Sequence, residues 1–363
     1  MSQLEKKLKP IVDAINKGKK VTFFNGAGIS TGAGIPDFRS PETGLYANLA
    51  KLNLPFAEAV FDIDFFEDNP KPFYTLAEEL YPGKYAPTKF HYLIKLLQDQ
   101  DSLLRVYTQN IDTLERLAGV EDDYIVEAHG SFARNHCIKC HREMDNETLK
   151  KHMHDETKDG IPTCETCQGY VKPDIVFFGE GLPGRFFQQW DEDCDDVEIA
   201  LVAGTSLTVY PFASLPASLG KKSLRVLINK EKVGDFSDNY RKSDIVILED
   251  CELFAEQLSS MLGLRDELEA LVEQSKSKFG TGKHISPETT VDEIEEKLKV
   301  EAHLHEKKED DDITELTEKT EKIGLTEETS FNNKEKEEKA KARAEAKEKA
   351  KIEKLEEIAN TYL

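Results

Sequence analysis

The chain has 363 residues, enough for one large domain with appendages, and its hydrophobic share of 39% is typical of a globular protein. A formal net charge of −22 argues against unspecific nucleic-acid binding, because contacts to phosphates need clustered Lys and Arg. The charge suits cationic partners such as Lys-rich protein tails, and no stretch has the pattern of a signal peptide or a membrane span. Six cysteines in such a chain favour metal binding or free thiols over disulfides, so we expect a cytoplasmic location, with the nucleus as a second one.

Short runs rich in β-branched and aromatic residues predict six strands. They cover residues 20–24, 103–107, 124–127, 199–203, 224–228 and 245–248. Several are apolar throughout, as expected for strands of a parallel sheet that is covered on both faces. Helical periodicity between them, for instance over residues 90–97 and 253–262, indicates alternating β and α elements. The pattern predicts an α/β fold with a Rossmann-like, doubly wound parallel sheet.

Other stretches depart from this alternation. Residues 41–89 hold many aromatics and prolines, which predicts a helical insertion, and residues 134–172 hold clustered cysteines, which predicts a small zinc-binding lobe. These parts and the sheet form one domain over residues 1–280. Few large apolar residues follow, so we expect an acidic, largely disordered tail over residues 281–363. Apolar residues at helical spacing predict a C-terminal helix over residues 333–363, either solvated or docked on this chain or a partner.

Unusual polar clusters come directly after five of the predicted strands. They are residues 25–28, 108–112, 128–130, 204–206 and 229–231. In open α/β sheets the ligand crevice lies outside the carboxyl ends of the strands. We therefore expect these clusters to converge on one cleft.

The first cluster contains closely spaced glycines, Gly26 and Gly28, with Gly32 beyond them. Such a loop lets backbone N–H groups approach a pyrophosphate, with a helix N-terminus behind them. The spacing is Gly-x-Gly-x-x-x-Gly rather than the usual dinucleotide fingerprint, and no acidic ribose ligand follows at the usual distance, so a simple turn is the alternative. Arg39 could reach a phosphate or pair with a carboxylate.

The cysteine pattern is more specific. Cys137 and Cys140, followed after 23 residues by Cys164 and Cys167, have the spacing of a tetrahedral zinc site. Four thiolates would close the coordination sphere, so the zinc is predicted to be structural. The alternatives are redox thiols or a chance pairing. His136 and His141 flank the first pair and could substitute as ligands, whereas Cys194 and Cys251 look isolated.

Single polar residues at strand ends are candidates for catalysis or ligand binding. His129 follows a strand and precedes Gly130, a position that suits a general base, although a lone histidine is more often structural. Asn110 could hold a ribose hydroxyl and Asp112 a carboxamide N–H, or either could cap the helix that is predicted to begin at Thr113.

Residues 172–180 are apolar and extended. They are either a core strand or an edge that pairs with an extended peptide and lines an apolar channel for a neutralised side chain.

Taken together, the motifs resemble the sirtuin family. The resemblance covers roughly residues 11–271, leaves out the tail, and is closest to the class I cytosolic branch that includes fungal homologues of the silent information regulator. Its carriers are GAGIS (26–30), GIPDFR (34–39), TQNID (108–112), HG (129–130), the four cysteines, PDIVFFGE (173–180), GTS (204–206) and INKE (228–231).

The resemblance implies a catalytic domain over residues 1–280 that binds NAD and a structural Zn²⁺. It implies that the cofactor contacts come from Gly26, Ala27, Gly28, Ser30, Asp37, Phe38, Arg39, Gln109, Asn110, Ile111, Asp112, Gly204, Thr205, Ser206, Asn229, Lys230, Glu231 and Cys251. Among these, Ile111 and Asp112 would hold the nicotinamide carboxamide and Asn110 the reactive ribose. Asn229 and Glu231 would lie near the adenosine ribose.

The resemblance also implies an NAD-dependent protein-lysine deacetylase. The acetyl-lysine would contact Val176, Phe177, Phe178, Gly179 and Glu180. Its amide oxygen would attack the ribose carbon as nicotinamide departs, with Asn110 and His129 as catalytic residues and His129 as the general base. The products would be free lysine, nicotinamide and O-acetyl-ADP-ribose.

The implied partners are acetylated proteins such as histone tails, with oligomerisation through the tail. Two other enzymes stay open at this point: a protein ADP-ribosyltransferase, which would share the cleft, and a zinc-dependent hydrolase, which would need an open coordination site and harder ligands than four thiolates. A non-enzymatic binding module is a further alternative.

Overall fold

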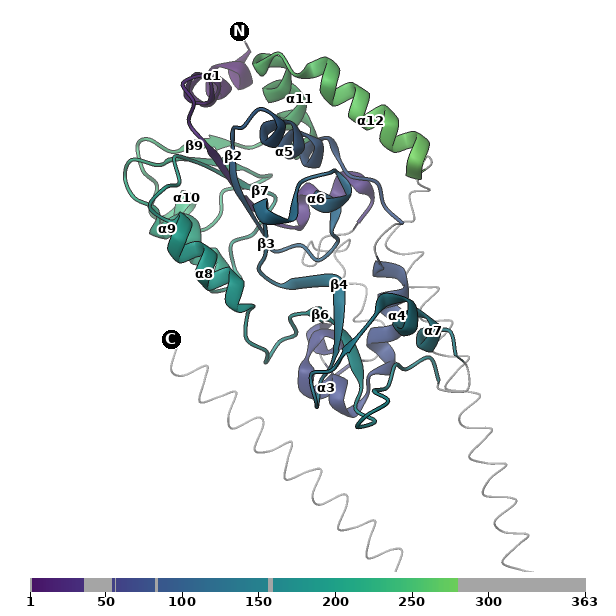
Figure 1. Ribbon diagram of the computed structural model, residues 1–363. Coiled ribbons are helices and arrows are strands. Elements are labelled where there is room, and N and C mark those ends of the chain that lie inside the picture. The colour runs from purple at the N-terminus through teal and green to yellow at the C-terminus, as the bar shows by residue number, and fades with distance from the viewer. Residues whose placement is uncertain (1, 36–53, 56, 82–83, 156–158, 280–363) are drawn as a thin grey trace, which may run out of the picture. The chain divides into compact units, whose positions relative to one another are not determined.

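The computed structural model describes residues 2–35, 54–55, 57–81, 84–155 and 159–279, and its main sheet has six parallel strands in the order β3-β2-β1-β7-β8-β9 (Figure 1). The strands are β1 (Val21–Asn25), β2 (Leu103–Thr108), β3 (Ile125–Glu127), β7 (Ile199–Ala203), β8 (Leu224–Ile228) and β9 (Ile245–Ile247). All six predicted strands are therefore confirmed, with bounds that shift by one residue at most. Within the described ranges, no helix is long and apolar enough to cross a membrane.

Both faces of this sheet are covered by helices. Side chains of β1 alternate between two cores: Phe23 packs with one set of buried residues and Phe24 with the other. The first core includes residues of α1 (Gln3–Ile15), α5 (Lys89–Asp99) and α11 (Cys251–Leu262). The second includes residues of α8 (Gly184–Asp193), α9 (Leu215–Ser218) and α10 (Asp235–Asp238), which lie on the other side of the sheet (Figure 1). Burial on both faces explains why the central strands are apolar throughout.

Two of these helices were predicted from their periodicity. Residues 90–97 lie within α5, and residues 253–262 lie within α11, whose C-cap is Gly263. A further helix, α12 (Arg265–Phe279), packs against α5 through Leu268, which is buried with Tyr92 and Leu96. The doubly wound α/β architecture is thus confirmed.

A second, smaller sheet follows β3. It has three antiparallel strands in the order β5-β4-β6, formed by β4 (Gly130–Cys137), β5 (Glu143–Met144) and β6 (Val171–Ile175). Helix α7 (Asn146–Met153) packs on it through the buried Leu149. This sheet was not predicted, and residues 172–175 of the ambiguous extended segment belong to it.

The region of the predicted helical insertion contains a 3₁₀ helix (Ala57–Phe61), α3 (Ile63–Asp68) and α4 (Lys71–Leu80). The hydroxyl of Tyr74 in α4 donates to the backbone carbonyl of Val171 in β6, which joins this region to the small sheet. Other predictions fall on residues outside the described ranges: Asp37, Phe38 and Arg39, the tail 281–363 and the helix 333–363.

The order of the strands changes direction at β1. Strands β2 and β3 lie on one side of β1, and β7, β8 and β9 follow on its other side. The loops that leave β1 and β7 therefore separate from each other at the carboxyl edge, where a doubly wound fold places its ligand.

Candidate active site

A cavity of about 710 Å³ lies at this edge. All five predicted polar clusters contribute to its wall, through Gly26, Ala27, Gly28, Gln109, Asn110, Ile111, His129, Gly204, Thr205, Ser206, Asn229, Lys230 and Glu231. Cys251, the first residue of α11, also lines it. The predicted convergence on one cleft is confirmed. Ser30 and Asp112 are not part of the wall and lie behind it, in contact with each other.

The glycine loops after β1 and β7 touch backbone to backbone. The N–H of Gly28 donates to the carbonyl of Gly204 at 2.8 Å, and a Cβ on Gly28 would lie 2.6 Å from the Cα of Gly204. Gly204 itself has a φ of +58°, which favours glycine. The loops leave bare backbone facing the cavity, as a pyrophosphate needs, so this wall fits the dinucleotide that the sequence predicts.

Over residues 26–35, the part of this region that the structure describes, the predicted α-helix does not follow the glycine loop. Two 3₁₀ helices, Ala27–Ile29 and Thr31–Ala33, follow β1 instead. The glycine-rich sequence has too little helix propensity to continue the turn, and Gly34 ends it with a φ of +92°. Anion binding here thus depends on the loop N–H groups rather than on the dipole of a long helix.

His129 has one bonded ring nitrogen and one without a partner. Its Nδ1 lies 3.0 Å from the backbone carbonyl of Gln109. Because a carbonyl only accepts, Nδ1 carries the proton and Nε2 presents a lone pair. Nε2 is buried and has no hydrogen-bond partner among the described residues, while the side chain lines the cavity. Burial lowers the pKa of His129, although the bond to Gln109 opposes this shift. The imidazole is therefore neutral near pH 7, as a general base must be.

The loop after β2 is fixed to both glycine loops. The side-chain amide nitrogen of Gln109 donates to Thr205 Oγ1 at 2.8 Å and to the carbonyl of Asn25 at 3.2 Å. The amide nitrogen of Asn110 donates to the carbonyl of Gly26 and to Ser30 Oγ, each at 3.2 Å. Among the described residues these bonds leave the amide oxygen of Asn110 as an acceptor for a ligand hydroxyl.

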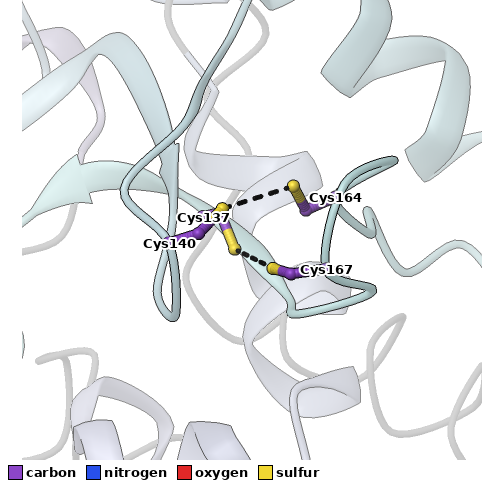
Figure 2. Close-up of side chains that lie close together, drawn as sticks. All are labelled: Cys137, Cys140, Cys164 and Cys167. Carbon is purple, nitrogen blue, oxygen red and sulfur yellow. Dashed lines mark hydrogen bonds between the residues drawn. The ribbon is translucent and has the colours of Figure 1, made fainter.

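Four cysteine side chains of the small lobe point toward one another (Figure 2). The sulfurs of Cys137 and Cys167 are 3.4 Å apart, those of Cys140 and Cys164 are 3.6 Å apart, and all four lie within 4.8 Å of one another. A tetrahedral zinc with Zn–S bonds of about 2.3 Å would separate its sulfurs by about 3.8 Å, so the group fits Zn²⁺.

The site has the composition of a structural metal centre. Four thiolates close the coordination sphere, and none of the four cysteines lines the cavity. The flanking histidines are not in the group: His136 Nδ1 instead lies 2.7 Å from Asp174. A hydrolase with zinc at the cavity is therefore not supported by this arrangement.

Comparison with known proteins agrees with this geometry. Residues 26–211 match the model of the Sir2 family. The chain belongs to that family, the sirtuins.

Three named relatives cover most of this sirtuin. An NAD-dependent protein deacetylase HST2 of Candida albicans is 69% identical over 295 residues, which cover 81% of this chain and 88% of the relative. An NAD-dependent protein deacetylase hst2 of Schizosaccharomyces pombe is 52% identical over 272 residues, with 74% and 80% covered. An NAD-dependent protein deacetylase sirtuin-2 of Danio rerio is 46% identical over 275 residues, with 71% and 72% covered.

Behind the cavity wall lies a group of three titratable side chains, of which the sequence singled out only Asp112. Asp112 accepts from Ser30 Oγ at 2.6 Å and from the N–H of Leu114 at 2.9 Å, so it also caps α6 (Leu114–Leu117). Side-chain atoms of His91, Asp112 and Glu115 lie within 4.8 Å of one another. Burial and the charge of Asp112 raise the pKa of Glu115 to about 7. His91 and Glu115 occupy ordinary helical positions in the sequence, so only their proximity in the structure identifies them as members of this group.

The opposite wall of the cavity is the segment after β6. Val176, Phe177, Phe178, Gly179 and Glu180 all line it. Phe177 is 1% exposed, whereas Phe178 is 42% exposed. The extended segment 172–180 is thus a strand up to Ile175 and part of the cavity wall beyond it, whereas the pairing with an extended peptide stays a prediction.

Cys251 stays a thiol. Burial raises its pKa to about 12, because the thiolate would lose its hydration. It therefore serves as a small apolar part of the cavity wall rather than as a nucleophile.

Proposed function

We propose that this sirtuin is an NAD-dependent protein-lysine deacetylase in which His129 is the general base. The observation that carries the proposal is the buried, unpartnered Nε2 of His129 on the wall of a cavity that also presents the bare glycine loops. The names of the relatives from Candida albicans, Schizosaccharomyces pombe and Danio rerio, each an NAD-dependent protein deacetylase, support the same activity.

The cofactor would be held along the carboxyl edge of the sheet. The N–H groups of Gly26 and Gly28 bond to the carbonyls of Ala203 and Gly204, so the N–H of Ala27 and the bare backbone of this loop would face the pyrophosphate. Thr205 and Ser206 would contact other parts of NAD from the loop after β7. Asn229 and Glu231, at the end of β8, would hold the adenosine ribose, near the apolar side chain of Cys251. The loops after β1 and β8 are each bonded to the loop after β7, through the Gly28–Gly204 bond and the bond from the side-chain amide of Asn229 to the carbonyl of Thr205, so the binding surface is preformed.

The reactive end would lie between Asn110 and His129. When bound, NAD supplies a ribose carbon whose bond to nicotinamide breaks, so that this carbon accepts the acetyl oxygen. Ile111 and Asp112 would hold the carboxamide, with Asp112 kept in place by Ser30. Asn110 would accept a hydrogen bond from the ribose. His129 Nε2 would then take the proton of a ribose hydroxyl, because Gln109 keeps the other ring nitrogen protonated.

Acetyl-lysine would enter along the wall formed by Val176 and Phe177. Acetylation removes the lysine charge, so an apolar wall can bury the side chain without an unpaired ammonium group. The chain's net charge of −22 favours cationic protein segments, and Lys-rich histone tails are the substrates that we propose.

The decisive experiment is product analysis. An acetylated Lys-rich peptide is incubated with the protein, with and without NAD, and the products are measured by mass spectrometry. We expect deacetylated peptide and nicotinamide in equal amounts, together with O-acetyl-ADP-ribose, and only when NAD is present. Deacetylation without NAD would refute the proposal, and so would transfer of ADP-ribose to the peptide.

We also propose that residues 281–363 regulate access to the site or assembly into oligomers. The support is the apolar stripe of the sequence at Ile352, Leu355, Ile358 and Tyr362. Removing residues 281–363 should change the KM for peptide or the mass found by light scattering. Identical values in both measurements would refute this role.

For the location we propose the cytoplasm and the nucleus. The support is that none of the six cysteines forms a disulfide, as is usual in reducing compartments. Imaging of the tagged full-length chain tests this, and accumulation in a secretory compartment would contradict it.

A further inference from the structure

One ion pair between a buried lysine and a half-buried glutamate lies beside the cavity without a role in the chemistry proposed above. Lys172, in β6, is 6% exposed, and Glu180 ends the segment that lines the cavity. Lys172 Nζ is 2.9 Å from Glu180 Oε2. This ion pair therefore joins the two ends of the nine-residue segment 172–180.

Each partner of this pair also bonds to the backbone between them. Lys172 Nζ donates to the carbonyl of Ile175 at 2.6 Å and to that of Pro173 at 3.3 Å. Glu180 Oε2 accepts from the N–H of Phe177 at 2.7 Å. The carbonyl of residue 175 and the N–H of residue 177 flank Val176, so the pair fixes the peptide groups on both sides of that residue.

The pair also fixes the ring of Phe177. The ammonium group of Lys172 lies 4.4 Å from the centroid of this ring, as in a cation–π contact. Phe61 and Phe73 contact the same ring edge to face, with centroids at 6.0 and 5.0 Å. Phe177 is thus enclosed by a charge and by aromatic rings, which leaves it little freedom to move.

The main chain of the segment is tied to the active site itself. The N–H of Val176 donates to the carbonyl of His129 at 2.8 Å. A displacement of residue 176 would therefore move the acyl-lysine wall relative to the proposed general base.

Stability alone does not account for an ion pair with one buried member. Desolvation of the Lys172 ammonium group offsets much of its attraction to Glu180, and a pair of apolar residues of similar size would often serve as well. Burial lowers the pKa of Lys172, whereas the charge of Glu180 raises it, so the cost of desolvation and the attraction to Glu180 act against each other. What apolar residues could not replace are the directed bonds to the peptide groups around Val176.

We propose that Lys172 and Glu180 are positioning residues that hold Val176 and Phe177 against the acyl-lysine side chain. The inference rests on the proposed function, because the acyl-lysine is the ligand that this wall would contact. It predicts that the pair affects the peptide substrate and leaves the NAD end of the cavity unchanged.

The test compares two single variants and their combination. Lys172→Met keeps the length and the apolar stem but removes the donors, and Glu180→Gln keeps an acceptor for Phe177 but removes the charge. The control is Lys9→Met, which breaks the exposed Lys9–Asp13 pair. For each protein the KM for acetylated peptide, the KM for NAD and the Tm are measured.

Both single variants should raise the peptide KM by about tenfold, because small displacements of a binding wall have large effects. The KM for NAD should stay within about twofold. Glu180→Gln should also lower the Tm, since it leaves the buried ammonium group of Lys172 without its carboxylate, whereas the double variant should regain Tm and keep the high peptide KM. Lys9→Met should match the wild type in all three.

Two results would overturn the inference. One is a double variant with a wild-type peptide KM. The other is a rise of both KM values in step with the loss of Tm, which indicates a merely structural role. Absence of NAD-dependent deacetylation by the wild type is a separate outcome, and it refutes the proposed function instead.

Discussion

The cavity at the main sheet and the cysteine lobe differ in what holds them in shape. The cavity lies at the edge of a sheet whose two faces are packed by large apolar cores, and its polar groups bond to one another across three loops. The buried cluster around the metal group of the lobe consists of Cys137, Leu149, Cys164 and Val171, and two of these four residues are metal ligands. A change in the lobe should therefore act on folding, and a change in the cavity on binding or on the chemical step.

The largest expected effect is loss of the metal. Chelation of zinc, or Cys164→Ser, should unfold the lobe and abolish deacetylation, because two of the four residues of the buried cluster at the metal group are its ligands. Zinc content, hydrogen exchange of residues 130–175 and turnover are measured together. Cys194→Ser, outside the metal group, is the matched control and should keep both zinc and activity. Full turnover by a zinc-free protein would show that the lobe does not depend on the metal for its folding.

The second effect belongs to the cavity. His129→Ala should lower kcat by about 10²–10⁴-fold, the usual contribution of a general base. NAD binding, measured by calorimetry, and zinc content should persist. His154→Ala, an exposed histidine near the end of α7 in the lobe, is the control. Retained turnover in the His129 variant would show that another group takes the proton.

A smaller effect is expected at the contact between the glycine loops after β1 and β7. Gly28→Ala places a methyl group 2.6 Å from the Cα of Gly204, so one backbone must shift and the KM for NAD should rise by about tenfold. Gly220→Ala has nothing within 4 Å of its new Cβ and should leave the KM unchanged. An unaltered KM in the Gly28 variant would mean that NAD does not use this loop.

The smallest effect concerns pH. The general base must be neutral, so kcat should fall as pH decreases through the pKa of His129. Because burial lowers this pKa, the midpoint of the acidic limb should lie below 6.5, the ordinary value for histidine. A kcat–pH profile at saturating NAD and peptide checks the sign. A midpoint above 6.5 would show that the bound imidazole is stabilised in its charged form.

The main sheet could be predicted because its chemistry is local. Strands such as residues 199–203 are buried on both faces, and burial of this kind requires a continuous apolar run that can be seen in the sequence. The polar turns that follow them are equally visible, and the topology of such sheets brings them together. The cysteine spacing carries its own signal, since two close pairs suit one tetrahedral ion.

Other parts of the site left no such signal. The group that orients His129 is the backbone carbonyl of Gln109, which every residue possesses. The strand β4 mixes polar and apolar residues and is defined by its partner β6, which comes after the intervening cysteines and α7. Lys172 and Glu180 look like ordinary surface charges until the fold buries the lysine.

The strand order has a consequence for synthesis of the protein. The two loops that touch behind the proposed pyrophosphate site leave β1, near the start of the chain, and β7, far along it. While the ribosome has made only the first half, β1 lacks one of its two neighbours, and the wall contributed by Gly204 does not exist. A nascent or prematurely terminated chain should therefore be unable to capture the dinucleotide, so that ligand binding reports on completion of the sheet.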